Sequence, residues 1–404
     1  MTETILVLNA GSSSIKFQLF GVSPDARLER RVKGQMEGIG SRPRLLAKDV
    51  DGHVLIDQTW PTPEVSTVPA ALDKVIAFLR QTIGSLPTAI GHRVVHGGPN
   101  YAEPTIVNAA VLNQLERLCP LAPLHQPHNV GLIRLIAARQ PHLLQVACFD
   151  TAFHRGHADV ADRYAIPEAL YTEGVRRYGF HGLSYEYIAT HLKEFAPEVA
   201  AGRVVVAHLG SGASMCAIAA GKSVESTMGF TALDGLPMGT RPGQLDAGVL
   251  LYLLSEKGMD AKGIERLLYN DCGLKALSGI SNDVRVLLGS SEKRAKLALE
   301  YFVYRVTLFT GMLVAAMGGI DAFIFTAGIG ENAPSIRSAV VQRLSCFGLQ
   351  IDEGANTRGG PLISARGSDV PCYVIPTDEE LMIARHTLRV WQQHSSPQLK
   401  EKRA

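Results

Sequence analysis

The feature of this 404-residue sequence that most constrains its fold is a strand-turn-strand pattern that occurs twice, about half a chain apart. The first copy has an apolar strand at 4–8, the turn NAGSSS and an alternating strand at 15–19. The second copy has a strand at 203–209, the turn GSGAS and a strand at 215–219. Repetition at this offset predicts an internal duplication, in which each half carries its own sheet and the ligand lies between the halves.

Helical and strand patterns alternate along the rest of the chain, which predicts an α/β protein. The expected strands lie at 89–95, 143–149 and 321–326. The expected helices lie at 70–82, 109–119, 129–139, 246–257, 261–269, 291–318, 334–344 and 379–392. The final segment, SSPQLKEKRA, has no apolar face and is expected to fray.

Composition excludes several classes of protein. Apolar residues make up 46% and charged residues 19%, which is atypical of a disordered chain. Lys and Arg number 40 against 38 Asp and Glu, so the net charge of +2 gives no footprint for nucleic acid or an anionic membrane. The charge-free stretch between Arg305 and Asp321 is too short to span a bilayer, and the N-terminus lacks a secretory signal pattern. We therefore expect a cytoplasmic protein with small-molecule ligands.

Cysteine and histidine spacing gives no sign of a metal site. The six cysteines are each at least 24 residues apart and form no CxxC pair, which argues against a zinc site or a disulfide framework. His154 and His157, in FHRGH, lack the partners that a metal needs nearby. We interpret these two histidines as groups at the surface or behind a binding site.

Three glycine-containing turns follow strands: NAGSSSIK at 9–16, HLGSGAS at 208–214 and TAGIGEN at 326–332. Such turns can present backbone amides and small hydroxyls to phosphate oxygens. None of them is a GxxxxGK[ST] or a complete GxGxxG sequence. Each turn alone is therefore weak evidence for a phosphate-binding site. Lys16 follows the first turn, where it either places an ammonium on a phosphate or is a solvated lysine.

Four polar residues stand out in apolar or glycine-rich surroundings. Arg93 in GHRVVHGG and Arg241 in LPMGTRPGQLD can offer a planar fork to a carboxylate or phosphate, or form structural ion pairs. Asp150 ends an apolar strand, where it either faces a ligand crevice or caps the next turn. His181, in RRYGFHGLS, is either a functional histidine or a core or capping residue.

Taken together, these strings resemble the acetate kinases. LVLNAGSSSIKF, GHRVVHGG, LAPLHQPHN, FDTAFH, RYGFHGLSY, HLGSGAS, GLPMGTRPG, FTAGIGEN and PTDEEL occur in the order and spacing of that family, over almost the whole chain. The resemblance implies two duplicated actin-like ATPase (ribonuclease H-like) domains around a central nucleotide cleft. It implies a first domain of residues 1–150 with a C-terminal helix at about 380–404, and a nucleotide-binding and dimerisation domain of residues 151–379.

The same resemblance implies roles for individual residues. Asp150 would be the catalytic carboxylate, and His181 and Arg241 would stabilise the phosphoryl group during transfer. Arg93 would bind the substrate carboxylate, with His125 beside the transferring group. The pocket for the acyl methyl would include Val95, Leu124 and Phe180.

The cofactors implied are Mg²⁺ or Mn²⁺, with ATP or ADP as co-substrate. Asn9 and Glu379 would help to hold the metal. The residues that would contact the nucleotide are Ser12, Ser14, Lys16, His208, Leu209, Gly210, Ser211, Gly212, Asp283, Val284, Arg285, Gly328, Ile329, Gly330, Glu331 and Asn332.

The chain departs from the family pattern at three positions. Ser211 replaces the usual Asn, Ala232 replaces a Pro of the acyl pocket, and Asp378 replaces an Asn beside the proposed metal site. The expected function is reversible transfer of the ATP γ-phosphoryl to acetate by a homodimer. A propionate or short-chain fatty acid kinase is the alternative, because Ala232 leaves more room than Pro. A nucleotide-driven binding module of the chaperone or actin kind is a third possibility.

Overall fold

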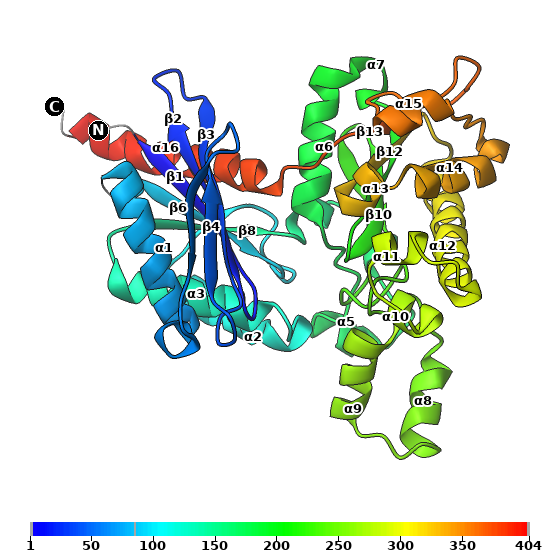
Figure 1. The fold of residues 1–404 in the computed structure, drawn as a ribbon, viewed down its shortest axis with the longest axis horizontal. Helices are drawn as coiled ribbons and strands as arrows, with labels where there is room; N and C mark the ends of the chain where they lie inside the picture. The colour runs from blue at the N-terminus through cyan, green and yellow to red at the C-terminus, as the bar shows by residue number, and fades with distance from the viewer. Residues whose placement is uncertain (1–2, 85, 402–404) are drawn as a thin grey trace. The chain divides into compact units, whose positions relative to one another are not determined.

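The computed structural model describes residues 3–84 and 86–401, and the chain divides into two units (Figure 1). Unit 1 comprises the residues up to Ala152 together with those from Asp378 onward. Unit 2 comprises Phe153–Thr377. The first unit is therefore assembled from both ends of the sequence.

Within the described part of unit 1, eight strands form one sheet in the order β5-β4-β3-β2-β1-β6-β8-β7. β1 pairs antiparallel with β2 and parallel with β6, which in turn pairs parallel with β8. The strands are β1 Thr4–Ala10, β2 Ile15–Val22, β3 Leu28–Glu37, β4 Arg44–Lys48, β5 Val54–Thr59, β6 Ala89–Val94, β7 Thr105–Ile106 and β8 Leu144–Phe149.

Helices cover the sheet of unit 1. They are α1 Val68–Ile83, α2 Ala109–Arg117, α3 Gln126–Arg139 and α16 Glu379–Glu401. α1 and α3 pack on the core that contains Phe17 and Leu19, whereas α16 contacts β1, β6 and β8. Gly91 permits the close approach of α16, since a Cβ there would lie 2.3 Å from Thr387 Oγ1. The C-terminal helix is thereby fixed to the first unit.

Within the described part of unit 2, five strands form a sheet in the order β11-β10-β9-β12-β13. The strands are β9 Arg203–Leu209, β10 Ala213–Ala219, β11 Lys222–Ser226, β12 Ala322–Thr326 and β13 Cys372–Val374. The helices are α4 Asp159–Asp162, α5 Glu168–Thr172, α6 Gly182–Phe195, α7 Pro197–Ala200, α8 Ala247–Ser255, α9 Ala261–Arg266, α10 Gly273–Ser278, α11 Val284–Leu288, α12 Lys293–Met317, α13 Ala327–Asn332, α14 Pro334–Arg343 and α15 Glu353–Arg358.

The two sheets share one topology, which confirms the predicted duplication. The order β3-β2-β1-β6-β8 in unit 1 corresponds to β11-β10-β9-β12-β13 in unit 2. In each unit the first two strands form an antiparallel hairpin, and the next two strands run parallel to the first. The carboxyl ends of the parallel strands meet at one edge in each unit, which is where open α/β sheets bind ligands.

The structure corrects the sequence-based prediction in two places. TAGIGEN is not an open glycine turn, because residues 327–332 form the short helix α13. The last helix does not end near Gln392 but continues to Glu401. The expected termini of α1, α3, α8 and α14 agree with the structure to within three residues.

Helix α12 lies within the 291–318 segment that the sequence predicts to be helical, and it extends well beyond the charge-free stretch between Arg305 and Asp321. Its 25 residues are sufficient in length and composition to cross a membrane. One face of the helix, however, is buried and contacts β9, β10 and β11 of its own unit. We therefore interpret α12 as a helix packed against a sheet, with an outer face that remains exposed.

Candidate active site

Arg93 and Asp150 form an ion pair at the carboxyl edge of the sheet in unit 1. Arg93 lies near the end of β6 and Asp150 directly follows β8, the neighbouring parallel strand. Nε and Nη2 of Arg93 donate to the two carboxylate oxygens of Asp150 at 3.1 and 2.6 Å. The Asp150 residue is 1% exposed. The fork of the arginine thus satisfies a carboxylate that has almost no access to water.

Glu379, at the start of α16, completes this group. Its Oε2 lies 3.6 Å from Arg93 Nε. Burial opposes the charge of Arg93, but the nearby carboxylates of Asp150 and Glu379 outweigh it and raise the Arg93 pKa. Burial also raises the pKa of Glu379, against the opposing effects of Arg93 and Lys16. Arg93 therefore remains a fixed cation among carboxylates.

The turn between β1 and β2 lies at the same edge of the sheet. Asn9 and Lys16 are partners across the hairpin. The backbone N–H of Gly11 donates to the Ser14 carbonyl at 2.8 Å, and Ser12 is exposed. Small residues and a tight backbone turn thus lie beside a lysine, an arrangement suited to an anion.

Two side chains that the sequence reasoning did not assign hold this edge together. The Oδ1 atom of Asn129 accepts from the backbone N–H of Val95 at 3.2 Å, and its Nδ2 donates to the Ala10 carbonyl at 3.0 Å. Gln126 bonds both the N–H and the C=O of His96, at 3.0 and 2.9 Å. Both residues are buried in α3. Both residues follow Leu124 and His125 in the family-like string LAPLHQPHN, so this string could have pointed to them.

Leu124 and His125 lie just before α3, where His125 is the N-cap residue. Leu124 is 40% exposed, whereas Val95 at the end of β6 is 6% exposed. Phe180 of unit 2 is buried. Of the residues expected to contact the acyl group, Val95 and Leu124 therefore belong to unit 1 and Phe180 belongs to unit 2.

In unit 2, the structure brings His181 and Arg241 together at Gly212. A Cβ on Gly212 would lie 2.9 Å from Arg241 Nη2 and 3.4 Å from His181 Nε2. Arg241 Nη1 donates to the Ala232 carbonyl at 2.7 Å, and burial lowers the pKa of Arg241. Glycine at 212 therefore allows a guanidinium and an imidazole to approach the backbone of this turn closely.

The backbone of His181 is in the left-handed region, with φ 56°. This conformation costs a non-glycine residue roughly 1–2 kcal/mol and is retained only where the surroundings impose it. The His181 Nδ1 and the Ser214 Oγ are 2.8 Å apart. The His181 ring also stacks on that of His208, with centroids 4.3 Å apart. The imidazole is thus held on two sides.

The turn after β9 carries the expected phosphate-binding residues. His208 Nδ1 and Ser184 Oγ are 2.8 Å apart, and Leu209 pairs with Ala213 across the hairpin. The Gly210 N–H donates to the Gly212 carbonyl at 3.1 Å, and the Ser211 carbonyl accepts from Gly239 N–H at 3.4 Å. Ser211 replaces a longer side chain, and its backbone is engaged within the turn.

The second expected phosphate loop, Gly328–Asn332, is helix α13. Asn332 Nδ2 donates to the Gly328 carbonyl at 2.9 Å, and a carboxylate oxygen of Glu331 accepts from Ala327 N–H at 2.9 Å. The buried Arg337 donates to the Gly330 and Glu331 carbonyls at 2.9 and 2.8 Å. Ile329 is among the half-buried residues of this helix. Arg337, which the sequence reasoning missed, satisfies carbonyls that a short helix leaves open.

Asp283 and Arg285, expected at the nucleotide, bond to one another. Arg285 Nη2 donates to Asp283 Oδ2 at 2.6 Å, and Asp283 caps α11 through the N–H of Arg285. The Arg285 side chain is 89% exposed. Val284, between them, is buried. The Arg285 side chain is therefore accessible to a ligand at the surface, whereas the Asp283 side chain caps helix α11.

Asp378, which replaces the usual Asn, has two partners in unit 1. It forms an ion pair with Arg30, and its Oδ1 accepts from the Leu381 N–H at 3.0 Å. A carboxylate in the first turn of a helix is favoured by the helix dipole. The additional negative charge is thus balanced by Arg30 and by the start of α16.

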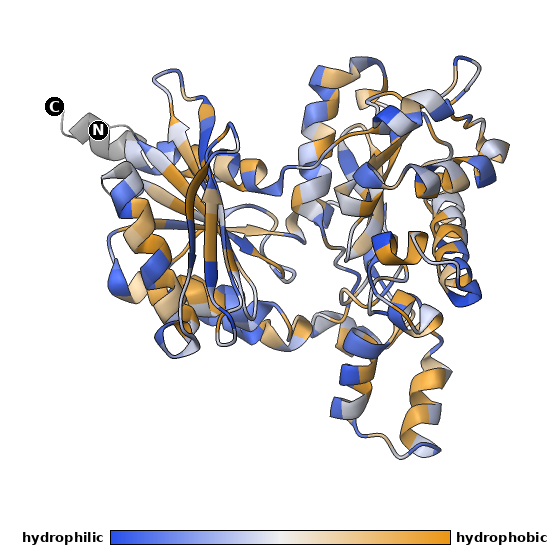
Figure 2. Cartoon of the chain, in the orientation of Figure 1, coloured by the Kyte–Doolittle hydropathy of each residue, from blue (hydrophilic) through white to orange (hydrophobic). Residues whose placement is uncertain are grey.

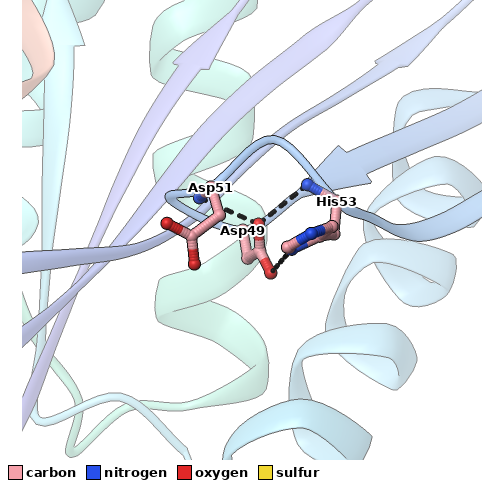
Figure 3. A group of neighbouring side chains, drawn as sticks. All are labelled: Asp49, Asp51 and His53. Carbon is pink, nitrogen blue, oxygen red and sulfur yellow. Dashed lines mark hydrogen bonds and ion pairs between the residues drawn. The ribbon is translucent and has the colours of Figure 1, made fainter.

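One further group of acidic and histidine side chains lies in the turn between β4 and β5 (Figure 3). Asp49 accepts from the backbone N–H of Asp51 and of His53 at 3.0 and 2.9 Å. The Asp49 carboxylate also lies 3.1 Å from His53 Nδ1. These hydrogen bonds account for the close approach of the three side chains, so we assign this group to the turn.

The FHRGH histidines are not at the surface, contrary to one of the two sequence interpretations. His154 is fully buried, and its Nε2 donates to the Phe180 carbonyl at 3.0 Å. Burial lowers the His154 pKa to about 3, so the ring is neutral and its Nδ1 must accept. The acceptor Nδ1 lies 2.7 Å from Ser223 Oγ, whose single proton is directed to it.

The chain of hydrogen bonds continues to His157, and the donor and acceptor in each bond follow from the neutral His154 ring. Because Ser223 donates to His154, its oxygen accepts from His157 Nε2, 2.7 Å away. The chain ends at the Phe180 carbonyl, adjacent to the strained backbone of His181. A Cβ on the neighbouring Gly179 would lie 2.6 Å from the His154 ring, so only glycine permits this approach. His154 and Ser223 are therefore positioning residues for His181.

With His181 at the expected site of phosphoryl transfer, we expect Ser223→Ala to lower kcat about tenfold or more, because small displacements of a group at a reacting centre are costly. It should also destabilise the fold by about 1–3 kcal/mol by leaving a buried acceptor unpaired. Ser226→Ala is the matched control, since Ser226 is buried on the same strand and its hydroxyl has no hydrogen-bond partner among the described residues. Equal kcat values for the two variants would contradict the positioning role.

The duplicated sheet topology, with phosphate-type turns at the central strands, defines a phosphotransferase or ATPase of the actin-like class. Comparison with known proteins is more specific. The acetokinase family profile matches residues 4–385. A curated relative named acetate kinase, from Nitrobacter hamburgensis, is 58% identical over 401 residues, which is 99% of each chain. The chain belongs to the acetokinase family.

Solved structures agree with this assignment and with the expected fold. A propionate kinase from Francisella tularensis is 35% identical with a TM-score of 0.89, over 96% of this chain and 99% of that one. The acetate kinase of Porphyromonas gingivalis is 34% identical with a TM-score of 0.85, over the same shares of the two chains. The predicted fold class, two duplicated actin-like ATPase domains, is confirmed.

Proposed function

We propose that the protein transfers the γ-phosphoryl group of ATP reversibly to the carboxylate of acetate, giving acetyl phosphate and ADP. The observation that carries this proposal is the 58% identity, over 99% of both chains, to a relative named acetate kinase. The guanidinium groups of Arg93 and Arg241 supply cations suited to this chemistry, and His181 lies near Arg241 at Gly212. The site residues assigned from the sequence are part of this proposal.

The acceptor needs no general base. A short-chain carboxylate has a pKa near that of Glu and is ionised at pH 7. A carboxylate oxygen attacks the γ-phosphorus in line, the bond from that phosphorus to the bridging oxygen breaks, and ADP leaves with the electron pair. Asp150, held by both arms of Arg93, orients the guanidinium instead of accepting a proton.

The main obstacle to this reaction is the repulsion between two anions. Fixed cations overcome it because they lie in place before the charge develops. Arg93 binds the acetate carboxylate, and His125 lies beside the transferring group. Arg241 and His181 stabilise the phosphoryl group on the side of Gly212. Val95 and Leu124 of unit 1 and Phe180 of unit 2 are assigned to the acyl methyl, as the family resemblance implies.

The oxygen atoms of Asn9 and Glu379 are the hard ligands that Mg²⁺ or Mn²⁺ prefers. Burial raises the pKa of Glu379, and a cation there would favour its charged form. When bound, the metal neutralises charge on the β- and γ-phosphates. The turns at 9–16 and 208–212, helix α13 and the 283–285 segment bind the nucleotide, and Lys16 contacts a phosphate. We place the reaction in the cytoplasm.

The alternative acceptor is propionate, which the printed name of one structural neighbour suggests. Ala232 offers its carbonyl to Arg241, so the position adjoins the proposed phosphoryl site. A proline retains that carbonyl but adds ring atoms. We expect wild-type kcat/KM to be higher for acetate than for propionate, and Ala232→Pro to widen the difference.

Hydroxylamine trapping of acyl phosphate, with each acid at equal concentration, measures both ratios. A wild-type preference for propionate would overturn the assignment of acetate. Release of ADP that does not depend on any acid would instead indicate a nucleotide-driven binding module. The control for Ala232→Pro is Ala232→Val, which adds volume at the same position without a ring. A proline placed elsewhere, such as Ala219→Pro, would break strand β10 and is not a suitable control.

We further propose a homodimer that forms through unit 2. The outer face of α12 exposes Leu297, Tyr304 and Leu308 at helical spacing, with 55, 46 and 45% exposed. Helix α8 is also strongly apolar and appears orange along most of its length (Figure 2). Large exposed apolar side chains grouped on one helix face are typical of an interaction site. Light scattering should give twice 43.5 kDa, and Leu308→Glu should give the monomer mass; a monomeric wild type would contradict the proposal.

A further inference from the structure

Unit 1 contains an apolar cavity that takes no part in the proposed reaction. The cavity has a volume of about 220 Å³ and lies where α1 and α3 approach the sheet. Its floor is formed by Leu6, Leu8 and Ile90, which are at most 3% exposed, and its walls include Ile76 and Ile136. The cavity is partly open to solvent, as the entry of a small molecule requires.

Positively charged side chains outnumber negatively charged ones in the lining of the cavity. Arg139 forms an ion pair with Asp73. Arg80, in the last turn of α1, has no ion-pair partner within 4.0 Å among the residues that the structure describes, and it is exposed. The lining therefore combines an apolar interior with one uncompensated positive charge.

We propose that this cavity binds one linear monocarboxylate of about six to eight carbons. A cavity of about 150 Å³ holds benzene, with six heavy atoms, so 220 Å³ accommodates about nine. The hydrocarbon chain lies among the apolar walls, and the carboxylate binds the Arg80 guanidinium. A second carboxylate would find no further free cation in the lining, which limits the ligand to one negative charge.

The ligand would be coupled to the acetate site through α3. Ile136 in the wall of the cavity lies two turns along the helix from Asn129, which bonds the backbone of Ala10 and Val95. Gln126, at the start of the same helix, bonds His96. A shift of α3 caused by the ligand would therefore move both the phosphate turn and the acyl strand end. This coupling rests on the proposed function, whereas the binding of the monocarboxylate to the cavity is independent of it.

Titration calorimetry of the full-length protein with octanoate tests the binding directly. We expect one site per chain in the presence of saturating acetate and ADP, and weaker binding of hexanoate and of octan-1-ol. Arg80→Gln should weaken octanoate binding about tenfold, the size expected for a lost charged hydrogen bond. Ile76→Trp, which fills the cavity, should abolish binding.

Arg117→Gln is the matched control, because Arg117 lies in the last turn of α2, is exposed and does not line the cavity. It should bind octanoate as the wild type does. Absence of binding to the wild type, loss of binding under saturating acetate, or unchanged binding in Arg80→Gln would each overturn the proposal. A protein that binds octanoate but forms no acetyl phosphate would contradict only the proposed function.

Discussion

Arg241→Ala is expected to lower kcat by a factor of several hundred, equivalent to about 3–4 kcal/mol in the barrier. Arg241 is half-buried, its Nη1 donates to the Ala232 carbonyl, and its Nη2 lies against Gly212. In the proposed reaction, a cation held in this way stabilises the charge that develops on the transferring phosphoryl group without having to reorganise. If it acts only in the transition state, kcat and kcat/KM fall together.

Steady-state kinetics of acetyl phosphate formation measure this loss. Arg241→Lys keeps the charge but not the planar fork, so an intermediate rate is expected. Arg203→Ala is the control, because Arg203 pairs with Asp321 in the same unit and its side chain is 40% exposed. A change in Arg241→Ala no larger than in the control would refute the assigned role.

Arg93→Ala is expected to destabilise unit 1 by about 3–5 kcal/mol, because it removes the guanidinium that compensates a buried carboxylate. Asp150 is 1% exposed, and Arg93 donates to both of its oxygens. The variant should also bind acetate poorly, since the remaining carboxylates repel an anion. Urea unfolding monitored by circular dichroism gives the change in stability.

The double variant Arg93→Ala/Asp150→Ala separates the two effects. Removing both charges should restore a large part of the stability, because the buried negative charge is removed together with the guanidinium, but it should not restore activity. If the double variant were no more stable than Arg93→Ala, the ion pair would not be the source of the loss. Recovered activity would show that neither group is needed for the reaction.

The duplicated architecture could be predicted because it depends on local patterns. A hairpin with a small-residue turn recurs at residues 4–19 and 203–219, and each copy forms the centre of a sheet. The strands between 28 and 59 were not predicted. β5 is mostly exposed on both faces, so its side chains do not alternate between apolar and polar, and periodicity cannot reveal it.

Contacts between residues far apart in the sequence explain the remaining errors. Glycines at 328 and 330 favour a turn, but Arg337 and Glu331 bond the backbone of this segment and support helix α13. The role of His154 depends on Ser223, 69 residues later, which no local pattern connects to it. Asn129 likewise acts on Ala10, at a separation of 119 residues. Such pairings become visible only in the fold.

The central claim is that a carboxylate oxygen of acetate forms the new bond to the transferred phosphorus. Acetate labelled with ¹⁸O in both carboxylate oxygens, incubated with ATP, Mg²⁺ and the enzyme, tests it by ³¹P NMR of the product. Attack by the carboxylate predicts acetyl phosphate whose phosphorus signal carries the isotope shift of a bridging ¹⁸O. An unshifted signal, or orthophosphate as the sole new product, would contradict the account.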